Sequence, residues 1–181
     1  MTSPFVTART TFAVACLAGV LVAVTAEARQ NQPPAPNQNM EVIHHDGYDR
    51  SVAMPFVPAI KIKSGTLLWL AGTTALPVYH DHPHRRDEVI KYLPNDLEAQ
   101  TRASMEGIKK TLEAAGGTFG DVVHMFVFRA RPRIGDLGRA SAVINAYFAP
   151  YNHKPTSTNL VVLELGEPEQ LIEIQMVAVV N

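Results

Sequence analysis

The stretch NDLEAQTRASMEGIKKTLEAAGG (residues 95–117), followed at once by TFGDVVHMFVFRAR (residues 118–131), decides the fold. Apolar side chains recur at steps of three and four through the first part, which predicts an amphipathic helix. Asn95 and Glu98 have capping-box spacing at its start, and Gly116-Gly117 ends it. The second part is rich in Val and Phe, which predicts a strand over 121–131.

Further elements are predicted on the C-terminal side of this stretch. A second helix begins with Asp136 as its N-cap and ends at Phe148, before Pro150. Its apolar face is made of Leu137, Ile144, Tyr147 and Phe148. Two nearly continuous apolar runs, about 157–165 and 170–180, predict strands that are buried on both sides.

The N-terminal side predicts shorter elements. Residues 41–45 form a short strand, and the β-prone runs 59–63 and 66–71 flank a Ser-Gly turn, which is typical of a hairpin. Residues 77–94 are polar and contain prolines, which predicts a long loop. The whole pattern is that of an α+β domain in which one mostly single, mixed sheet carries two helices on one face. The other face then needs cover, which self-association would provide.

The first 28 residues have the pattern of a secretory signal peptide. Arg9 precedes an apolar run from Phe12 to Val24, and the small-x-small sequence Ala26-Glu27-Ala28 follows it. The run is shorter than the roughly 20 residues that span a bilayer, so cleavage after Ala28 is expected. A retained N-terminal anchor is the alternative. Cys16 lies inside the apolar run, which argues against a lipoprotein.

The mature protein is then expected to be periplasmic or secreted, with no membrane contact after cleavage. Residues 29–40 are rich in Pro, Gln and Asn and predict a flexible leader. Residues 41–181 form one domain. The net charge of −1 makes nucleic acid a poor partner. The single cysteine leaves with the signal peptide, so no disulfide or thiolate metal site remains.

Six short segments, in order over about residues 54–180, resemble the Rid (YjgF) family. Each is weak alone, but together they identify the chain as a member. The segments are Pro55-Phe56-Val57-Pro58-Ala59, Leu70-Ala71-Gly72-Thr73, Gln100 with Leu112–Gly117, Asp121-Val122-Val123, Asn145-Ala146-Tyr147-Phe148 and Leu171-Ile172-Glu173-Ile174.

The resemblance implies a chorismate-mutase-like fold and a homotrimer with a small-molecule cleft between subunits. In deaminating members, an arginine on the penultimate strand binds the substrate carboxylate. A glutamate of the last strand, here Glu173, positions the water that attacks a C=N bond. No cofactor is implied. The residues that would line the substrate pocket are Phe56, Gly72, Thr73, Thr156, Ser157 and Asn159.

The chain departs from the family at the carboxylate-binding position. The arginine falls on Ser157, or on Thr156 with a shift of one residue. A hydroxyl lacks the charge and the planar fork with which a guanidinium matches a carboxylate. Lys154 lies near but at a different backbone position, and Phe56 replaces the family's tyrosine.

Glu173 itself has two interpretations. It is a strand carboxylate paired with a lysine, or it is functional. Its apolar neighbours favour function, because a carboxylate among them is costly unless it is partnered or used.

The loop sequence His80-Asp81-His82-Pro83-His84 places three imidazoles at alternate positions, which could converge on a metal ion. Arg85 and Arg86 follow and would repel a cation. We therefore expect a solvated polar loop without metal, with His80, His82 and His84 only as weak candidate ligands. His44, His45 and His124 are expected to be local polar or core residues.

Two functions fit these features. The first is a divergent hydrolase of small imines or enamines, weak on 2-imino acids, with Glu173 positioning water. The second is a trimer that binds a small ligand without turnover, which the missing arginine and tyrosine favour. Ribonuclease activity, also attached to the family, is disfavoured by the charge and the export signal.

Overall fold

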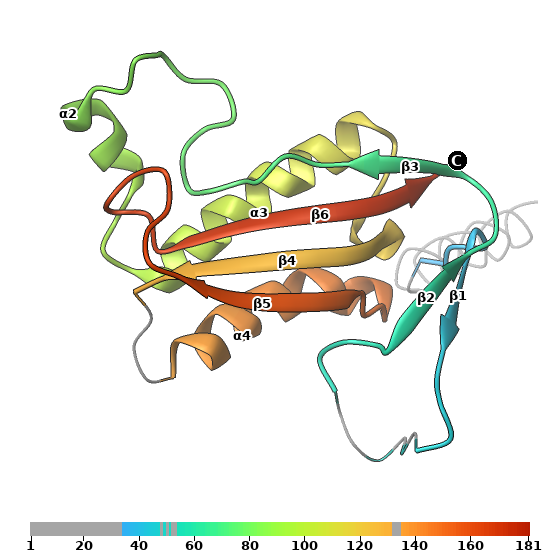
Figure 1. The fold of residues 1–181 in the computed structure, drawn as a ribbon. Helices are drawn as coiled ribbons and strands as arrows, with labels where there is room; N and C mark the ends of the chain where they lie inside the picture. The colour runs from blue at the N-terminus through green and yellow to red at the C-terminus, as the bar shows by residue number, and fades with distance from the viewer. Residues whose placement is uncertain (1–33, 48, 50, 52–53, 132–134) are drawn as a thin grey trace, which may run out of the picture. The chain divides into compact units, whose positions relative to one another are not determined.

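The computed structural model describes residues 34–47, 49, 51, 54–131 and 135–181. A four-stranded mixed sheet in the order β3-β6-β4-β5 forms its centre, and two long helices cover one face of that sheet (Figure 1). The bounds are β3 Thr66–Trp69, β4 Val122–Ala130, β5 Thr156–Val162, β6 Ile172–Val180, α3 Leu97–Ala114 and α4 Asp136–Phe148. The predicted α+β class with helices on one face of a mixed sheet is confirmed.

Helix α3 forms as its periodicity predicts. Its apolar stripe is buried against the sheet, with Met105 and Ile108 fully inaccessible to solvent. The cap is Asp96 rather than Asn95, since the Asp96 side chain accepts a hydrogen bond from the backbone N–H of Glu98. Gly116, at φ +72°, ends the helix in the left-handed conformation that glycine adopts without strain.

Helix α4 has the predicted range, but its first turn differs from the prediction. Gly135, at φ +87°, is the N-cap, and Asp136 is the first helical residue. Leu137 is exposed, so its assignment to the apolar face was wrong, whereas Ile144 and Phe148 are buried as expected.

The two C-terminal strands differ in burial. Strand β6 lies in the middle of the sheet, antiparallel to both β3 and β4, and is buried as predicted. Strand β5 is parallel to β4 and forms an edge, with Leu160 and Val161 exposed. In one chain the prediction of two-sided burial is therefore wrong for β5, because Leu160 and Val161 lie on opposite faces and neither face is covered at this edge of the sheet.

The predicted hairpin over residues 59–71 is also wrong. Strand β2 (Ala59–Ile62) pairs with β1 (Met40–Ile43) in a separate two-stranded sheet, while β3 pairs with β6. The Ser-Gly turn passes the chain from one sheet to the other, with Gly65 at φ +89°. The backbone oxygen of Asn39 accepts hydrogen bonds from the N–H groups of Lys63 and Ser64, which holds the turn.

Part of the predicted leader belongs to the domain. The Asn37 side chain donates to the backbone oxygen of Val179 and to Asp121, and Met40 is buried beside Val177 and Val179. The predicted leader therefore ends before Asn37. The predicted signal peptide, residues 1–28, lies outside the described residues.

The predicted loop 77–94 contains two short helical segments, α2 Arg86–Val89 and η1 Ile90–Tyr92. The two other short 3-10 segments are η2 Phe119–Asp121 and η3 Ala149–Tyr151. In the part of the chain that the structure describes, no helix is long and apolar enough to cross a membrane.

Candidate functional site

The sheet face opposite α3 and α4, called here the open face, carries the predicted residues Glu173 and Thr156. Successive strand residues point to opposite faces, so the register of the sheet assigns each side chain to a face. Phe128 pairs with both Glu173 and Leu160, and Phe126 pairs with both Gln175 and Thr158. The small β1-β2 sheet covers one end of this face through Met40 and Ile60. The rest of the face presents Phe126, Phe128, Thr156, Thr158, Leu160, Glu173 and Gln175.

Glu173 lies half-buried on the open face, directly over Gly72. A Cβ atom placed on Gly72 would lie 2.9 Å from the carboxyl carbon of Glu173, so any other residue here would displace this carboxylate from its position. The backbone of Thr73 holds Gly72 close to β6, since its N–H donates to the Ile174 carbonyl at 2.9 Å and its C=O accepts from the Ile174 N–H at 3.0 Å. The structure thus brings together Gly72 and Glu173, whereas the Thr73 side chain lies on the helix side, where a Cβ atom placed on Gly107 of α3 would lie 2.9 Å from its methyl group.

The Glu173 carboxylate forms no hydrogen bond or ion pair with any residue in the described part of the chain. The interpretation of Glu173 as half of a structural ion pair with a lysine therefore finds no partner there. A carboxylate that shares the open face with Phe126 and Phe128 and has no partner among the described residues is available to accept a proton or a hydrogen bond from a bound molecule.

A second group of predicted residues lies at the start of β5. Phe56 is partly exposed, and the neighbouring Val57 N–H donates to the Pro155 carbonyl at 3.2 Å. A cavity of about 310 Å³ opens here, and its lining includes Phe56, Val57 and Lys154.

The β5 residues alternate between the two faces. Thr156 lies on the open face beside His124, whereas Ser157 pairs with Met125 of the helix-side core and Asn159 pairs with Val127. In one chain, Ser157 and Asn159 thus lie on the opposite face of the sheet from Glu173.

The Thr156 hydroxyl is already engaged. It donates to the backbone oxygen of Val123 at 2.8 Å and lies 2.6 Å from His124 Nδ1. Because the hydroxyl has one hydrogen, His124 must donate from Nδ1. Burial lowers the pKa of His124, so the ring is neutral at pH 7. Its Nε2 atom has no hydrogen-bond partner among the described residues, which makes His124 a polar group of the open face that the sequence did not single out.

The two groups are far apart within one chain. Glu173 shares its row with Phe128 and Leu160, whereas Thr156 lies four residues earlier on β5. At about 3.3 Å per residue, that offset is about 13 Å along the strands, and β4 lies between β5 and β6 in addition. One small molecule cannot contact both groups of a single chain.

Sequence reasoning also missed a buried arginine on the helix side. Arg129 is 8% exposed, and its Nε atom has no partner in the described part of the chain. It lines a cavity of about 500 Å³ at the start of α3 and α4, together with Asp136, Arg139 and Glu169. The signal in the sequence was a lone arginine within the apolar run of β4.

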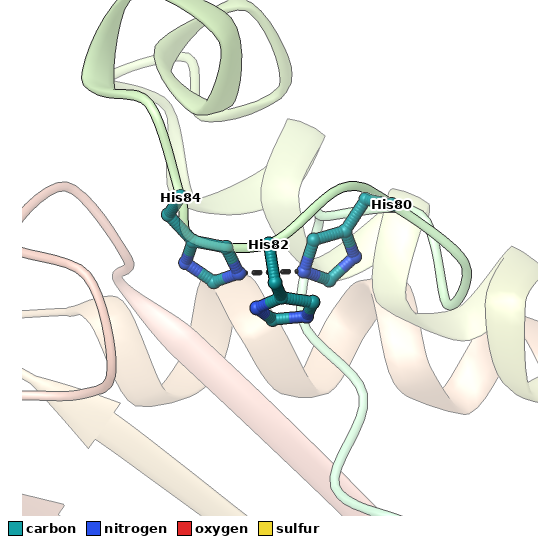
Figure 2. Close-up of side chains that lie close together, drawn as sticks. All are labelled: His80, His82 and His84. Carbon is teal, nitrogen blue, oxygen red and sulfur yellow. Dashed lines mark hydrogen bonds between the residues drawn. The ribbon is translucent and has the colours of Figure 1, made fainter.

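The three histidines of the polar loop do converge. Possible ligand atoms of His80, His82 and His84 all lie within 4.8 Å of one another (Figure 2). The expectation of a merely solvated loop therefore missed how close these side chains lie.

A family model described as Endoribonuclease L-PSP matches residues 49–180. A solved structure of a Rid-family protein of unknown function, YyfB of Yersinia pestis, superposes with a TM-score of 0.59 at 27% identity, over 79% of this chain and 100% of that one. The chain belongs to the Rid (YjgF) family. The predicted membership is confirmed.

Two relatives illustrate how distant its curated relatives are. A RutC family protein of Pyrococcus horikoshii is 32% identical over 117 residues, which are 65% of this chain and 82% of that protein. The 3-aminoacrylate deaminase RutC of Acinetobacter baylyi is 29% identical over 138 residues, or 76% of this Rid protein and 96% of the relative.

Proposed function

We propose that this Rid protein hydrolyses small imines or enamines and is weak on 2-imino acids. The observation that carries the proposal is the Glu173 carboxylate, which lies over Gly72, shares a sheet face with Phe126 and Phe128, and has no hydrogen-bond or ion-pair partner among the described residues. The name of the Acinetobacter relative supports the reaction class.

The chemistry needs one carboxylate and one water molecule. Glu173 accepts a proton from water as the oxygen attacks the carbon of the protonated imine, which gives a neutral carbinolamine. The same proton then passes to the nitrogen, Glu173 takes the hydroxyl proton as the C–N bond breaks, and a carbonyl compound and ammonia leave, with the remaining proton going to ammonia. An enamine reaches the same path after protonation at carbon. Measuring ammonia release above the uncatalysed rate, from a panel of imines with and without a carboxylate, tests the proposal.

We further propose a homotrimer in which the Glu173 group of one subunit faces the Thr156 group of the next. The offset of about 13 Å along the strands between these groups in one chain supports this arrangement. The open face also exposes Trp69, at 65%, and Leu67, at 50%, which is unusual for large apolar side chains on a sheet.

Light scattering at micromolar concentration is expected to give about three times the monomer mass. Replacing Trp69 by Asp should shift the protein toward monomer, because a carboxylate would be buried in the interface. Tyr79, 93% exposed on the polar loop, supplies the control, and Tyr79→Asp should stay trimeric. A wild-type protein that runs as a monomer would contradict the trimer.

Export is the third part of the proposal. The pattern from Arg9 to Ala28 supports removal of residues 1 to about 28. N-terminal sequencing of protein recovered from the periplasm or medium should begin near Arg29. Protein that keeps Met1 and is recovered only from the cytosol would contradict export.

The second candidate function is ligand binding without turnover. It is favoured by the engaged Thr156 hydroxyl and by the orientation of Ser157 away from Glu173. Native mass spectrometry of the purified protein would detect a retained small molecule. A retained ligand together with no ammonia release from any imine would favour this function over hydrolysis.

A further inference from the structure

The loop that follows β3 folds three imidazoles into one cluster. His80 and His84 lie with Nε2 atoms 2.7 Å apart, and the His82 ring stacks on His84 with ring centroids 4.4 Å apart. Figure 2 shows the three rings grouped below one turn of the chain. Nothing in the proposed hydrolysis uses this cluster.

The outer nitrogens of two rings determine where the protons lie. His80 Nδ1 lies 2.6 Å from the Pro77 carbonyl oxygen, and His84 Nδ1 bonds to a carboxylate oxygen of Glu167. A carbonyl and an ionised carboxylate only accept hydrogen bonds, so both Nδ1 atoms must donate. In the neutral rings, both Nε2 atoms then carry lone pairs, and these lone pairs point at each other across 2.7 Å. A cation between the two Nε2 atoms, either a shared proton or a metal ion, makes the arrangement favourable.

These outer contacts are those that support metal-binding histidines. Such a histidine typically donates its second N–H to a carboxylate or a backbone carbonyl, which fixes the ring and its tautomer. His84 has the first kind of partner and His80 the second. Glu167 is itself held, because its N–H donates to Gln170 Oε1 at 3.0 Å and the Gln170 side chain is buried against Thr74.

The two arginines beside the cluster do not oppose a cation as the sequence suggested. Arg85 pairs with Asp87 at 3.3 Å and with Glu88 at 3.6 Å. Arg86 pairs with Glu169. Both guanidinium charges are therefore offset by carboxylates of the described residues.

We propose that His80, His82 and His84 bind one divalent transition metal, with Zn²⁺ as the reference ion. Zn–N bonds of about 2.0–2.1 Å at tetrahedral angles separate two ligand nitrogens by roughly 3.3 Å. The His80–His84 pair has to open by a few tenths of an ångström, and His82 has to close in. Both changes are side-chain rotations of partly exposed residues. Three imidazoles leave a fourth position open to water.

Calorimetric titration of Zn²⁺ into chelator-treated full chain, without any purification-tag histidines, tests this site. We expect one ion per chain with micromolar or tighter affinity. His80→Ala or His84→Ala should weaken binding at least a hundredfold. Glu167→Gln keeps the shape of the side chain but removes its charge, and should weaken binding about 10- to 100-fold. His45→Ala is the matched control, an exposed histidine outside the cluster, and should bind as wild type.

A second measurement keeps the test independent of folding defects. Far-ultraviolet circular dichroism should be unchanged in every variant, and saturating Zn²⁺ should raise the Tm of wild type and His45→Ala but not of His84→Ala. Absence of stoichiometric Zn²⁺ binding by wild type would overturn the proposal. Binding by His80→Ala and His84→Ala that is as tight as that of wild type would also overturn it. The hydrolase proposal does not depend on the result, because Glu173 and Gly72 are not ligands.

Discussion

2-Iminopropionate, generated in situ, should be hydrolysed about 30-fold to several thousandfold more slowly by this Rid protein than by an arginine-bearing relative. Losing a charge-assisted, bidentate contact to the substrate carboxylate weakens substrate and transition-state binding by about 2–5 kcal/mol. At about 1.4 kcal/mol per tenfold in rate, that loss gives the stated range. The chain offers Ser157 or Thr156 at this position.

Neither of these two hydroxyl groups compensates for the missing arginine in the structure. Thr156 already donates its proton to Val123, and Ser157 points to the helix side in one chain. The buried Arg129 also belongs to the helix side and cannot reach Glu173 across the sheet. A coupled assay beside the relative, at equal protein concentration, measures the ratio. Equal turnover would mean that Lys154, Arg85, Arg86 or another subunit supplies the cation.

Glu173→Gln should lower turnover of any accepted imine by about 10²- to 10⁴-fold, the usual contribution of a positioned general base. The amide keeps the size of the side chain but accepts no proton at neutral pH. The Kd for a non-reacting analogue, from calorimetry, should change far less than kcat. An effect on the Kd with little effect on kcat would assign Glu173 to binding instead.

Two glycines provide a matched pair for the same site. Gly72→Ala places a Cβ against the Glu173 carboxylate, so it should lower kcat by displacing that group. A Cβ atom placed on Gly138, in α4, would meet no other atom within 4 Å, so Gly138→Ala should keep full activity. It should also stabilise the protein by about 0.4–1 kcal/mol, through the unfolded chain. Equal activity in both variants would contradict the placement of Glu173.

Local patterns predicted the elements that are built from local contacts. The stripe through Met105 and Ile108 and the glycine at 116 specify α3 without knowledge of the rest of the chain. The hairpin failed because strand pairing is not local. Trp69 pairs with Val177, more than a hundred residues later, and Asn39 binds the turn that the hairpin would have used.

The site residues were likewise recognisable from local sequence, whereas their contacts depend on distant segments. Glu173 was identifiable from a family motif, but its contact with Gly72 depends on the segment after β3 running antiparallel beside β6. The alternation of His80, His82 and His84 suggested convergence. The carboxylates that hold His84 and offset the charge of Arg86, however, are Glu167 and Glu169 of a distant loop. The position of Ser157 on the helix side follows from the register of β5 with β4, which the sequence does not encode locally.

The most direct test of the central claim compares wild type with Glu173→Gln on a carboxylate-free imine released by an amine oxidase. Ammonia formation is followed against the enzyme-free rate. We predict that wild type accelerates the reaction and that Glu173→Gln loses about 99% or more of that acceleration, in line with the usual contribution of a general base. No acceleration by wild type across the imine panel, or equal acceleration by both proteins, would contradict a hydrolase that acts through Glu173.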